Sequence, residues 1–273
     1  MILIKILVTI LVVTFLSVIA ERGGPRLAGI LAGYPAGSAI SLFFIGLEVG
    51  PDFAGQSAMY NVAGMVALQT FLLIYYLVTA RIPAQNRWGA ILAGVSAATA
   101  GFLAAAALLR LINLPPWAGA GLTALAIPAF HSLFRRIGNS AIRQRVQLGP
   151  RVLLFRASIS AGVVVVITGV AGLVGPQWAG LFSAFPATVL PLVLILHHTY
   201  GVEHAHTVIK NVPLGLWSLV MYSITVSYAY PRLGLAWGTM VSFGVATLYL
   251  LGLAGARAWQ NRTLACQAGT KLV

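Results

Sequence analysis

Long apolar segments follow one another along almost the whole chain, and they leave few alternatives for its fold. Nine of them occur in the 273 residues, at 2–20, 27–49, 57–80, 88–110, 117–134, 152–174, 177–199, 207–230 and 233–254. About 20 apolar residues are needed for a helix to cross the hydrocarbon core of a bilayer. Strands of a membrane β-barrel would instead alternate apolar and polar residues. The sequence therefore predicts an all-α polytopic membrane protein with about nine transmembrane helices.

The charge content excludes a water-soluble fold. Charged residues make up 8% of the chain, whereas a soluble domain carries roughly 25%. The 17 lysines and arginines far outnumber the 4 aspartates and glutamates. In a soluble protein this excess would suggest nucleic acid, but in a membrane protein it usually records topology, because positive residues stay in cytoplasmic loops. We expect the lipid bilayer as a partner and no nucleic acid.

The positive charges fall almost entirely on one side of the nine segments. Fourteen of the 17 lie on that side, several of them in the basic stretch 135–151, and only Lys5, Arg110 and Arg232 lie on the other. The charge-rich side is expected to be cytoplasmic, which predicts an external N-terminus and a cytoplasmic C-terminus. The basic stretch is either a linker between two halves or a segment at anionic headgroups.

Two halves of the chain align without a gap at a shift of 151 residues. The matching pairs are Gly24 and Gly175, Pro25 and Pro176, Pro35 and Pro186, Gly50 and Gly201, Asp52 and Glu203, and Lys5 and Arg156. Chance matches of glycine are common in membrane helices, but a fixed offset that also pairs prolines, an acid and a base indicates duplication. Segment 2–20 also resembles a secretory signal; its second copy favours a retained helix.

The repeat predicts how the chain is organised. Residues 1–111 form repeat one and 152–258 form repeat two, each with four transmembrane helices; 112–151 supply a linker helix and a basic cytoplasmic loop, and 259–273 a cytoplasmic tail. One extra crossing between the copies turns the second upside down. Inverted-topology repeats are the design in which many secondary transporters alternate access around a midplane site.

Prolines interrupt the second segment of each repeat at equivalent positions, Pro35 and Pro186. Proline removes a helix hydrogen bond, and paired interruptions of this kind are the best sequence pointer to a transporter's binding site. The predicted substrate-binding residues around them are Tyr34, Pro35, Ser38, Ser41, Ser183, Phe185, Pro186 and Thr188. The alternative is structural, because prolines are ordinary in membrane helices and hydroxyls often bond their own backbone.

Four residues near the ends of the segments are candidates for gating or ion coupling: Glu48, Asp52, His197 and Glu203. None of the acids lies at a predicted midplane, which argues against a buried carboxylate relay. If the repeats are inverted, Asp52 and Glu203 are symmetry mates near opposite faces. They are then either gates that bind a cation or proton alternately, or solvated loop residues.

Four histidines gather between positions 197 and 206. Imidazole and carboxylate are good ligands for zinc, nickel or copper(II), so His198, His204 and His206 are candidate metal ligands. Their spacing does not place a pair three or four residues apart on one helix face. The cluster is otherwise a polar turn or a pH-sensitive gate. We expect no cofactor, with a divalent transition metal as the alternative.

Enzyme motifs are missing from the sequence. No phosphate loop, nucleotide fingerprint or Gly-x-Ser-x-Gly elbow occurs, and no Ser–His or paired-Asp arrangement lies at helical depth. The single cysteine, Cys266, allows no intramolecular disulfide. The chain is therefore not expected to be an enzyme.

Two stretches resemble a group of small bacterial inner-membrane proteins. Residues 24–36 read Gly-Pro-x-x-Ala-Gly-x-x-Ala-Gly-Tyr-Pro-Ala and lead to Leu-Glu-Val-Gly at 47–50. Residues 179–187 read Ala-Gly-Leu-Phe-Ser-Ala-Phe-Pro-Ala and lead to His-His-Thr-Tyr-Gly at 197–201, which is similar to the shorter GlpM-like family. The resemblance implies a multi-pass protein of the bacterial inner membrane with a repeated fold, and it implies no substrate. The positions it selects are Pro35, Glu48, Pro186 and His197.

The sequence predicts a small secondary transporter that moves a polar or anionic solute between inverted repeats. Half-helix N-termini carry partial positive charge, which favours an anion. The alternative is a non-transporting subunit of a larger membrane assembly, for example in exopolysaccharide export, the role suggested by the resemblance. A metal-binding membrane protein is the third reading. The expected partners are a small solute and either a second copy of the chain or a membrane complex.

Overall fold

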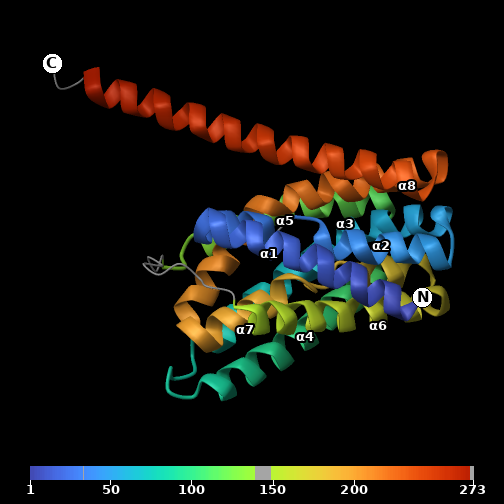
Figure 1. Cartoon of the computed structure of the whole chain (residues 1–273), viewed down its shortest axis with the longest axis horizontal. Coiled ribbons are helices and arrows are strands. Elements are labelled where there is room, and N and C mark those ends of the chain that lie inside the picture. Colours follow the sequence, from blue (N-terminus) through green and yellow to red (C-terminus); the bar gives the residue numbers. More distant parts are fainter. Residues whose placement is uncertain (33, 139–148, 271–273) are drawn as a thin grey trace.

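The protein is a bundle of helices (Figure 1). The computed structural model describes all residues except 33, 139–148 and 271–273. The elements are α1 (Ile2–Ala32), α2 (Ala36–Glu48), α3 (Pro51–Thr79), α4 (Arg87–Ile112), α5 (Pro116–Phe134), α6 (Pro150–Ser183), α7 (Val189–Tyr200) and α8 (Val202–Thr270). No strand occurs among the described residues.

Five helical stretches are long and apolar enough to cross a membrane: Pro51–Thr79, Arg87–Ile112, Pro116–Phe134, Val152–Ser183 and Val202–Leu253. Three shorter apolar stretches accompany them: Ile2–Phe15, Ala36–Glu48 and Val189–Tyr200. These lengths and compositions are those of a multi-pass helical membrane protein. The all-α class expected from the sequence is confirmed at this level, and the count of nine crossings stays a prediction.

The predicted segment 27–49 is two helices in the structure. The chain leaves α1 at Ala32 and enters α2 at Ala36, directly after Pro35. The predicted segment 177–199 is divided in the same way, between the end of α6 and the start of α7. Both breaks contain the same tight turn, in which the Ala36 amide donates to the Tyr34 carbonyl at 2.7 Å and the Ala187 amide to the Phe185 carbonyl at 2.6 Å. Both prolines therefore mark real breaks, as their missing amide hydrogens lead one to expect.

Two longer helices bend sharply at glycines. In α6 the bend is at Gly175 (φ 81°) and in α8 at Gly234 (φ 73°). A straight helix over the 52 residues Val202–Leu253 would measure about 78 Å, more than twice the thickness of the hydrocarbon core. Instead the two arms of α8 pack together, since a Cβ on Gly238 would lie 2.6 Å from the Tyr230 ring. Figure 1 shows the chain doubling back there.

The C-terminal part of α8 extends past the last apolar segment. Helix α8 continues to Thr270, and the assignment of 259–273 as a cytoplasmic tail stays a prediction. In Figure 1 this end of the helix projects beyond the rest of the bundle. The region 207–230 also starts earlier than expected, because α8 begins at Val202, directly after Gly201.

Glycines with positive φ connect α2 to α3 and α7 to α8. Gly50 has φ 128° and ψ 156°, and Gly201 has φ 103° and ψ 164°. An L-residue seldom adopts this conformation, and forcing one into it costs about 1–3 kcal/mol. The two glycines are one of the pairs that the 151-residue shift aligns.

Replacing Gly50 by alanine is expected to lower the free energy of unfolding by about 1–3 kcal/mol. The cost comes from the backbone alone, because a Cβ at Gly50 would have nothing within 4 Å. The matched control is Gly244→Ala, an open helical position, where alanine should stabilise the helix by up to about 1 kcal/mol. Unfolding of purified protein by SDS titration measures both. Equal effects of the two substitutions would contradict the prediction.

Candidate functional site

The two broken helices meet at α3, deep inside the bundle. Ser38 of α2 and Ser183 at the end of α6 are 5% and 1% exposed. The Ser38 hydroxyl donates to the Ser183 carbonyl at 2.8 Å. The predicted breaks therefore lie side by side, as expected if both belong to one site.

Asn61 of α3 connects the breaks to α8. Its Nδ2 donates to the Ser183 hydroxyl at 2.8 Å and to the Ser38 hydroxyl at 3.3 Å. Its Oδ1 accepts a hydrogen bond from Ser223 of α8 at 2.8 Å. Both Asn61 and Ser223 are completely buried. We call these four residues, Ser38, Asn61, Ser183 and Ser223, the polar junction.

Sequence reasoning missed Asn61 and Ser223. The available signal was an amide side chain inside an otherwise apolar segment, because polar groups at membrane depth are usually paired and functional. Gln69 gives the same signal on the same helix, yet its described hydrogen bond runs to the Met65 carbonyl of its own helix. Only the positions of the neighbouring helices distinguish the two amides.

Close packing holds the polar junction shut. A Cβ on Gly180 would overlap the Ser57 carbonyl oxygen of α3 and lie 2.7 Å from Tyr60 Cβ. A Cβ on Gly64 would lie 2.7 Å from Ala184 Cβ and 3.1 Å from the Leu181 carbonyl oxygen. Small residues allow this approach of helices, and in membranes they replace the hydrophobic effect as the basis of helix packing.

The other predicted binding residues surround the junction without joining it. The Tyr34 hydroxyl pairs with Thr247 of α8 at 3.0 Å. Phe185 packs edge-on against Phe71 and Phe102, with ring centroids 5.6 and 5.1 Å apart. Ser41 is buried and its hydroxyl has no hydrogen-bond partner. Pro35 and Pro186 are buried and Thr188 is half-buried.

Two pockets lie at opposite ends of α3 and the first arm of α8. The Asp52 pocket, of about 470 Å³, is lined by Asp52, Gln56 and Tyr60 of α3 and by Ser227 and Pro231 of α8, among others. The Glu203 pocket, of about 420 Å³, is lined mainly by Glu203 and His206 of α8 and by Tyr76, Ala80 and Ile137. The start of each helix therefore faces the end of the other, and each start carries a carboxylate.

The same 151-residue shift relates the linings of the two pockets. It pairs Asp52 with Glu203 and Gly55 with His206 from the helix starts. It also pairs Tyr76 with Ser227 and Ala80 with Pro231 from the helix ends. Each pocket thus takes one side of its lining from each half of the chain. The sequence aligned the two acids, and the other three pairs emerge only from the pockets.

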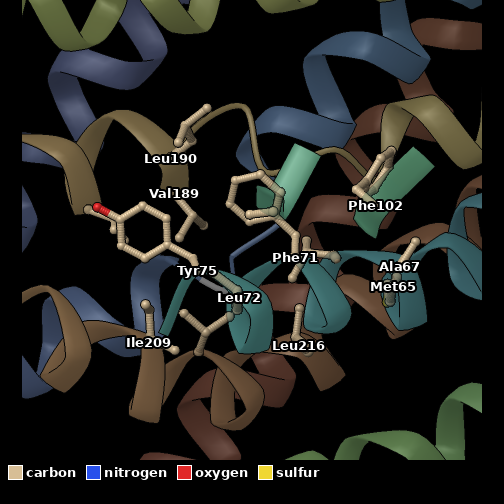
Figure 2. Packing of buried hydrophobic residues seen from close by; sticks show 14 of the residues in the cluster. Met65, Ala67, Phe71, Leu72, Tyr75, Phe102, Val189, Leu190, Ile209 and Leu216 are labelled. Carbon is tan, nitrogen blue, oxygen red and sulfur yellow. The ribbon is translucent and has the colours of Figure 1, made fainter. Parts of the chain in front are cut away.

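An apolar layer separates the polar junction from the Glu203 pocket. From Asn61 to Thr79, a distance of about 27 Å along α3, buried apolar side chains such as Met65, Leu68 and Leu72 line the helix. They belong to one buried cluster with Val189 and Leu190 of α7 and with Ile209 and Leu216 of α8, part of which Figure 2 shows. On the other side, Tyr60 lines the Asp52 pocket and is the residue next to Asn61. The barrier is therefore thinner toward Asp52.

The histidines of the predicted metal cluster point to different partners. His197 Nδ1 lies 2.8 Å from the Tyr75 hydroxyl, and His206 Nε2 lies 2.8 Å from the Thr79 hydroxyl. The ring of His198 packs against Trp88, with ring centroids 4.6 Å apart, and the ring of His204 packs against Tyr200, with ring centroids 5.8 Å apart. Within the described part of the chain, no three histidine, cysteine, aspartate or glutamate side chains are grouped to hold a metal ion.

Two buried cations have contrasting environments. Lys5 donates to Glu48 and to Thr168, both at 2.7 Å. The predicted gating residue Glu48 is thus occupied in an ion pair. Arg156 of α6, the counterpart of Lys5, is 6% exposed and donates only a long 3.4 Å hydrogen bond, from Nη2 to the Thr188 carbonyl. Its Nε and Nη1 are buried without partners.

Comparison with protein-family models, with curated proteins and with solved structures finds no match to this chain. Its function is therefore argued from its own geometry.

Proposed function

We propose that the protein is a small secondary transporter that alternates access to the polar junction between the Asp52 pocket and the Glu203 pocket. The observation that carries this proposal is the pair of carboxylate-bearing pockets at opposite ends of α3 and α8. A transporter needs one entrance on each face and a binding region between them. The polar junction lies between the pockets on the same two helices.

The proposal includes inverted repeats and nine crossings. Counting the bends at Gly175 and Gly234 as helix ends, and each proline-broken pair of half-helices as one crossing, gives eight segments. The ninth requires that α1, a single helix from Ile2 to Ala32 in the structure, be divided near Gly24, which the 151-residue shift pairs with Gly175. Duplication is supported by the matched turns at the two prolines and by the matched glycine conformations at 50 and 201. Repeats of this kind commonly rock against one another around discontinuous helices.

The distribution of arginines between the two ends of the helices supports one orientation of the protein in the membrane. Arg81, Arg87, Arg135 and Arg136 lie near the end of α3 or α5 that adjoins the Glu203 pocket, whereas Arg110 and Arg232 lie at the opposite helix ends. Because positive residues accumulate in the cytoplasm, we assign the Glu203 pocket to the cytoplasmic face and the Asp52 pocket to the external face. The membrane is the bacterial inner membrane in this proposal.

The polar junction is closed in this conformation, so transport requires movement. None of the three pockets that the structure describes in detail is lined by Tyr34, Ser38, Ser183 or Thr188. Separation of α8 from α3 near Ser223 would open the thin barrier toward Asp52. Opening toward Glu203 requires displacement of the apolar layer around Leu72. In this proposal, the two carboxylates at the entrances bind a cation or proton alternately.

A non-transporting membrane subunit is the second candidate. The close packing at Gly180 and Gly64 favours it, because a scaffold needs no opening. The two candidates differ in whether water ever reaches the polar junction.

Cysteine accessibility tests the proposal without knowledge of the solute. Cys266 is the only cysteine, so Cys266→Ser gives a cysteine-free background. Ser223→Cys is then treated with a membrane-impermeant methanethiosulfonate reagent in right-side-out and in inverted vesicles. We expect modification from both sides, because the site alternates. Ala98→Cys, buried in α4, is the matched negative control and should react from neither side.

Asp52→Cys and Glu203→Cys check the assigned orientation in the same vesicles. Asp52→Cys should react from outside and Glu203→Cys from the cytoplasmic side. If Ser223→Cys stays unreactive from both sides while these two react, the transport proposal is wrong and the subunit is favoured.

A further inference from the structure

We propose that the break between α6 and α7 is a binding site for a small monocarboxylate, with Arg156 as its positively charged ligand. This inference rests on the proposed function and names the class of solute. The observation behind it is a guanidinium that is buried at a helix break and that pairs with no acid among the side chains that the structure describes.

Arg156 has far more hydrogen-bonding capacity than its surroundings use. A guanidinium carries five N–H donors and stays charged in proteins. Here only Nη2 has an acceptor, the Thr188 carbonyl at 3.4 Å, while Nε and Nη1 are buried and unpartnered. An unpaired charge at membrane depth is expensive, and such residues mark substrate or ion pathways.

The three acids whose side chains the structure describes either pair with another base or line a pocket that does not include Arg156. Glu48 pairs with Lys5, and Asp52 and Glu203 line the two pockets at the ends of α3. The 151-residue shift shows that Arg156 differs from its counterpart in the first half in having no acid at the equivalent position. Its counterpart Lys5 has an acid at position 48, whereas the equivalent position in the second half is Thr199. The second half has kept the buried base and lacks the residue that would neutralise it.

Helix N-termini add positive potential at the same break. Thr188 caps the 12-residue helix α7 without a side-chain hydrogen bond to its amides. A Cβ at Gly37, in the first turn of the 13-residue helix α2, would lie 3.4 Å from Thr188 Cγ2. Two helix N-termini, each with partial positive charge, therefore converge beside the carbonyl that Arg156 contacts. Some of their amides are already used, because the Ala36 amide donates to Tyr34 and the Leu190 amide to Pro186.

Neighbouring hydroxyls complete the proposed site. Ser160, one turn along α6 from Arg156, donates to the Ala187 carbonyl at 2.8 Å and holds the break against α6. Ser41 lies one turn after Gly37 and on the same face of α2. Its hydroxyl is buried and has no partner, so it is available as a further donor.

The chemistry of these groups selects a singly charged, planar anion. The rigid guanidinium fork matches the two oxygens of a carboxylate. Arg156 supplies one positive charge, so a monoanion neutralises it and a dianion would leave a buried negative charge. The close approach of α2 to Thr188, where a Cβ added at Gly37 would already be in van der Waals contact, favours a small ligand.

Acetate is the probe for the test. The chain has 6 tryptophans, so their fluorescence reports thermal unfolding of the full-length protein in detergent. Sodium acetate is titrated at constant ionic strength against sodium MES, a bulky sulfonate. We expect a saturable rise in Tm of about 3–6 °C when acetate reaches ten times its dissociation constant.

Three variants make the result specific. Arg156→Met should abolish the rise, and Arg156→Lys should weaken it because the charge stays and the fork is lost. Arg110→Met, at an exposed arginine, should behave as wild type. Without acetate, Arg156→Met should raise Tm, since it removes an unpaired buried charge. A structural arginine would instead lower Tm on substitution.

The outcomes separate this inference from the proposed function. No saturable rise in the wild-type protein, or an equal rise in Arg156→Met, overturns the carboxylate site. If Ser223→Cys is nonetheless modified from both sides, the protein transports another solute. If the acetate effect depends on Arg156 but Ser223→Cys never reacts, the site binds carboxylate in a protein that does not transport.

Discussion

Gly180→Ala is expected to destabilise the protein by about 3 kcal/mol, the upper end of the usual range for overpacking. The new Cβ would overlap the Ser57 carbonyl oxygen and lie 3.0 Å from the Asn61 amide nitrogen. These are backbone atoms of α3, so no side-chain rotation relieves the overlap. The end of α6 must move away from α3, and the hydrogen bond between Asn61 and Ser183 is then lost.

Gly162→Ala is the control for this substitution. Gly162 lies in the same helix and is exposed, and its Cβ would meet nothing within 4 Å. Alanine there should stabilise α6 by up to about 1 kcal/mol. SDS titration of both variants gives the difference in the free energy of unfolding. If Gly180→Ala is as stable as Gly162→Ala, then α6 does not pack against α3 as closely as the structure shows.

Asn61→Leu is expected to lower the free energy of unfolding by about 2 kcal/mol, because three interhelical hydrogen bonds are lost and each contributes about 0.6 kcal/mol in membrane proteins. The substitution leaves Ser223 without the acceptor it uses in this structure. Ser38 and Ser183 still donate to backbone carbonyls, which limits the loss of free energy of unfolding. Under the proposed function, the leucine should also prevent modification of Ser223→Cys.

Asn211→Leu is the matched control for Asn61→Leu. Asn211 lies in α8 and donates to the Thr207 carbonyl of its own helix. Loss of this hydrogen bond should lower the free energy of unfolding by less than about 1 kcal/mol. A double-mutant cycle between Asn61→Leu and Ser223→Ala measures the interhelical bond directly. A coupling energy near zero would show that the polar junction does not join α3 to α8.

Under the proposed duplication, the polar junction and Arg156 give the protein an asymmetric centre within a repeated frame. Asn61 corresponds to Val212 in the second half, and the paired Lys5 corresponds to the unpaired Arg156. In the proposed transporter, the symmetric frame would provide two equivalent entrances, whereas recognition of one solute would require different groups on its two sides. This difference between the halves is where we expect specificity to reside.

Local sequence determined the membrane class and marked candidate positions for the breaks. Apolar runs set the helices, because unpaired backbone groups are too costly in hydrocarbon. Pro35 and Pro186 marked places where helical hydrogen bonding could end, whereas Pro128 and Pro213 lie inside α5 and α8 without ending them. Gly50 and Gly201 likewise act through their own backbone. These effects depend on residues near one another in the chain, so they could be predicted without the fold.

Only the tertiary structure decided what the functional groups touch. Asn61 and Gln69 are both amides in one apolar segment, yet only Asn61 is seen to bond the broken helices, because those helices approach α3 at its level. Asp52 and Glu203 were aligned by the repeat, but the pockets around them arise from the end of the opposite helix. Whether Arg156 has a counter-charge depends on every element packed around it, and that information is distributed over the whole chain.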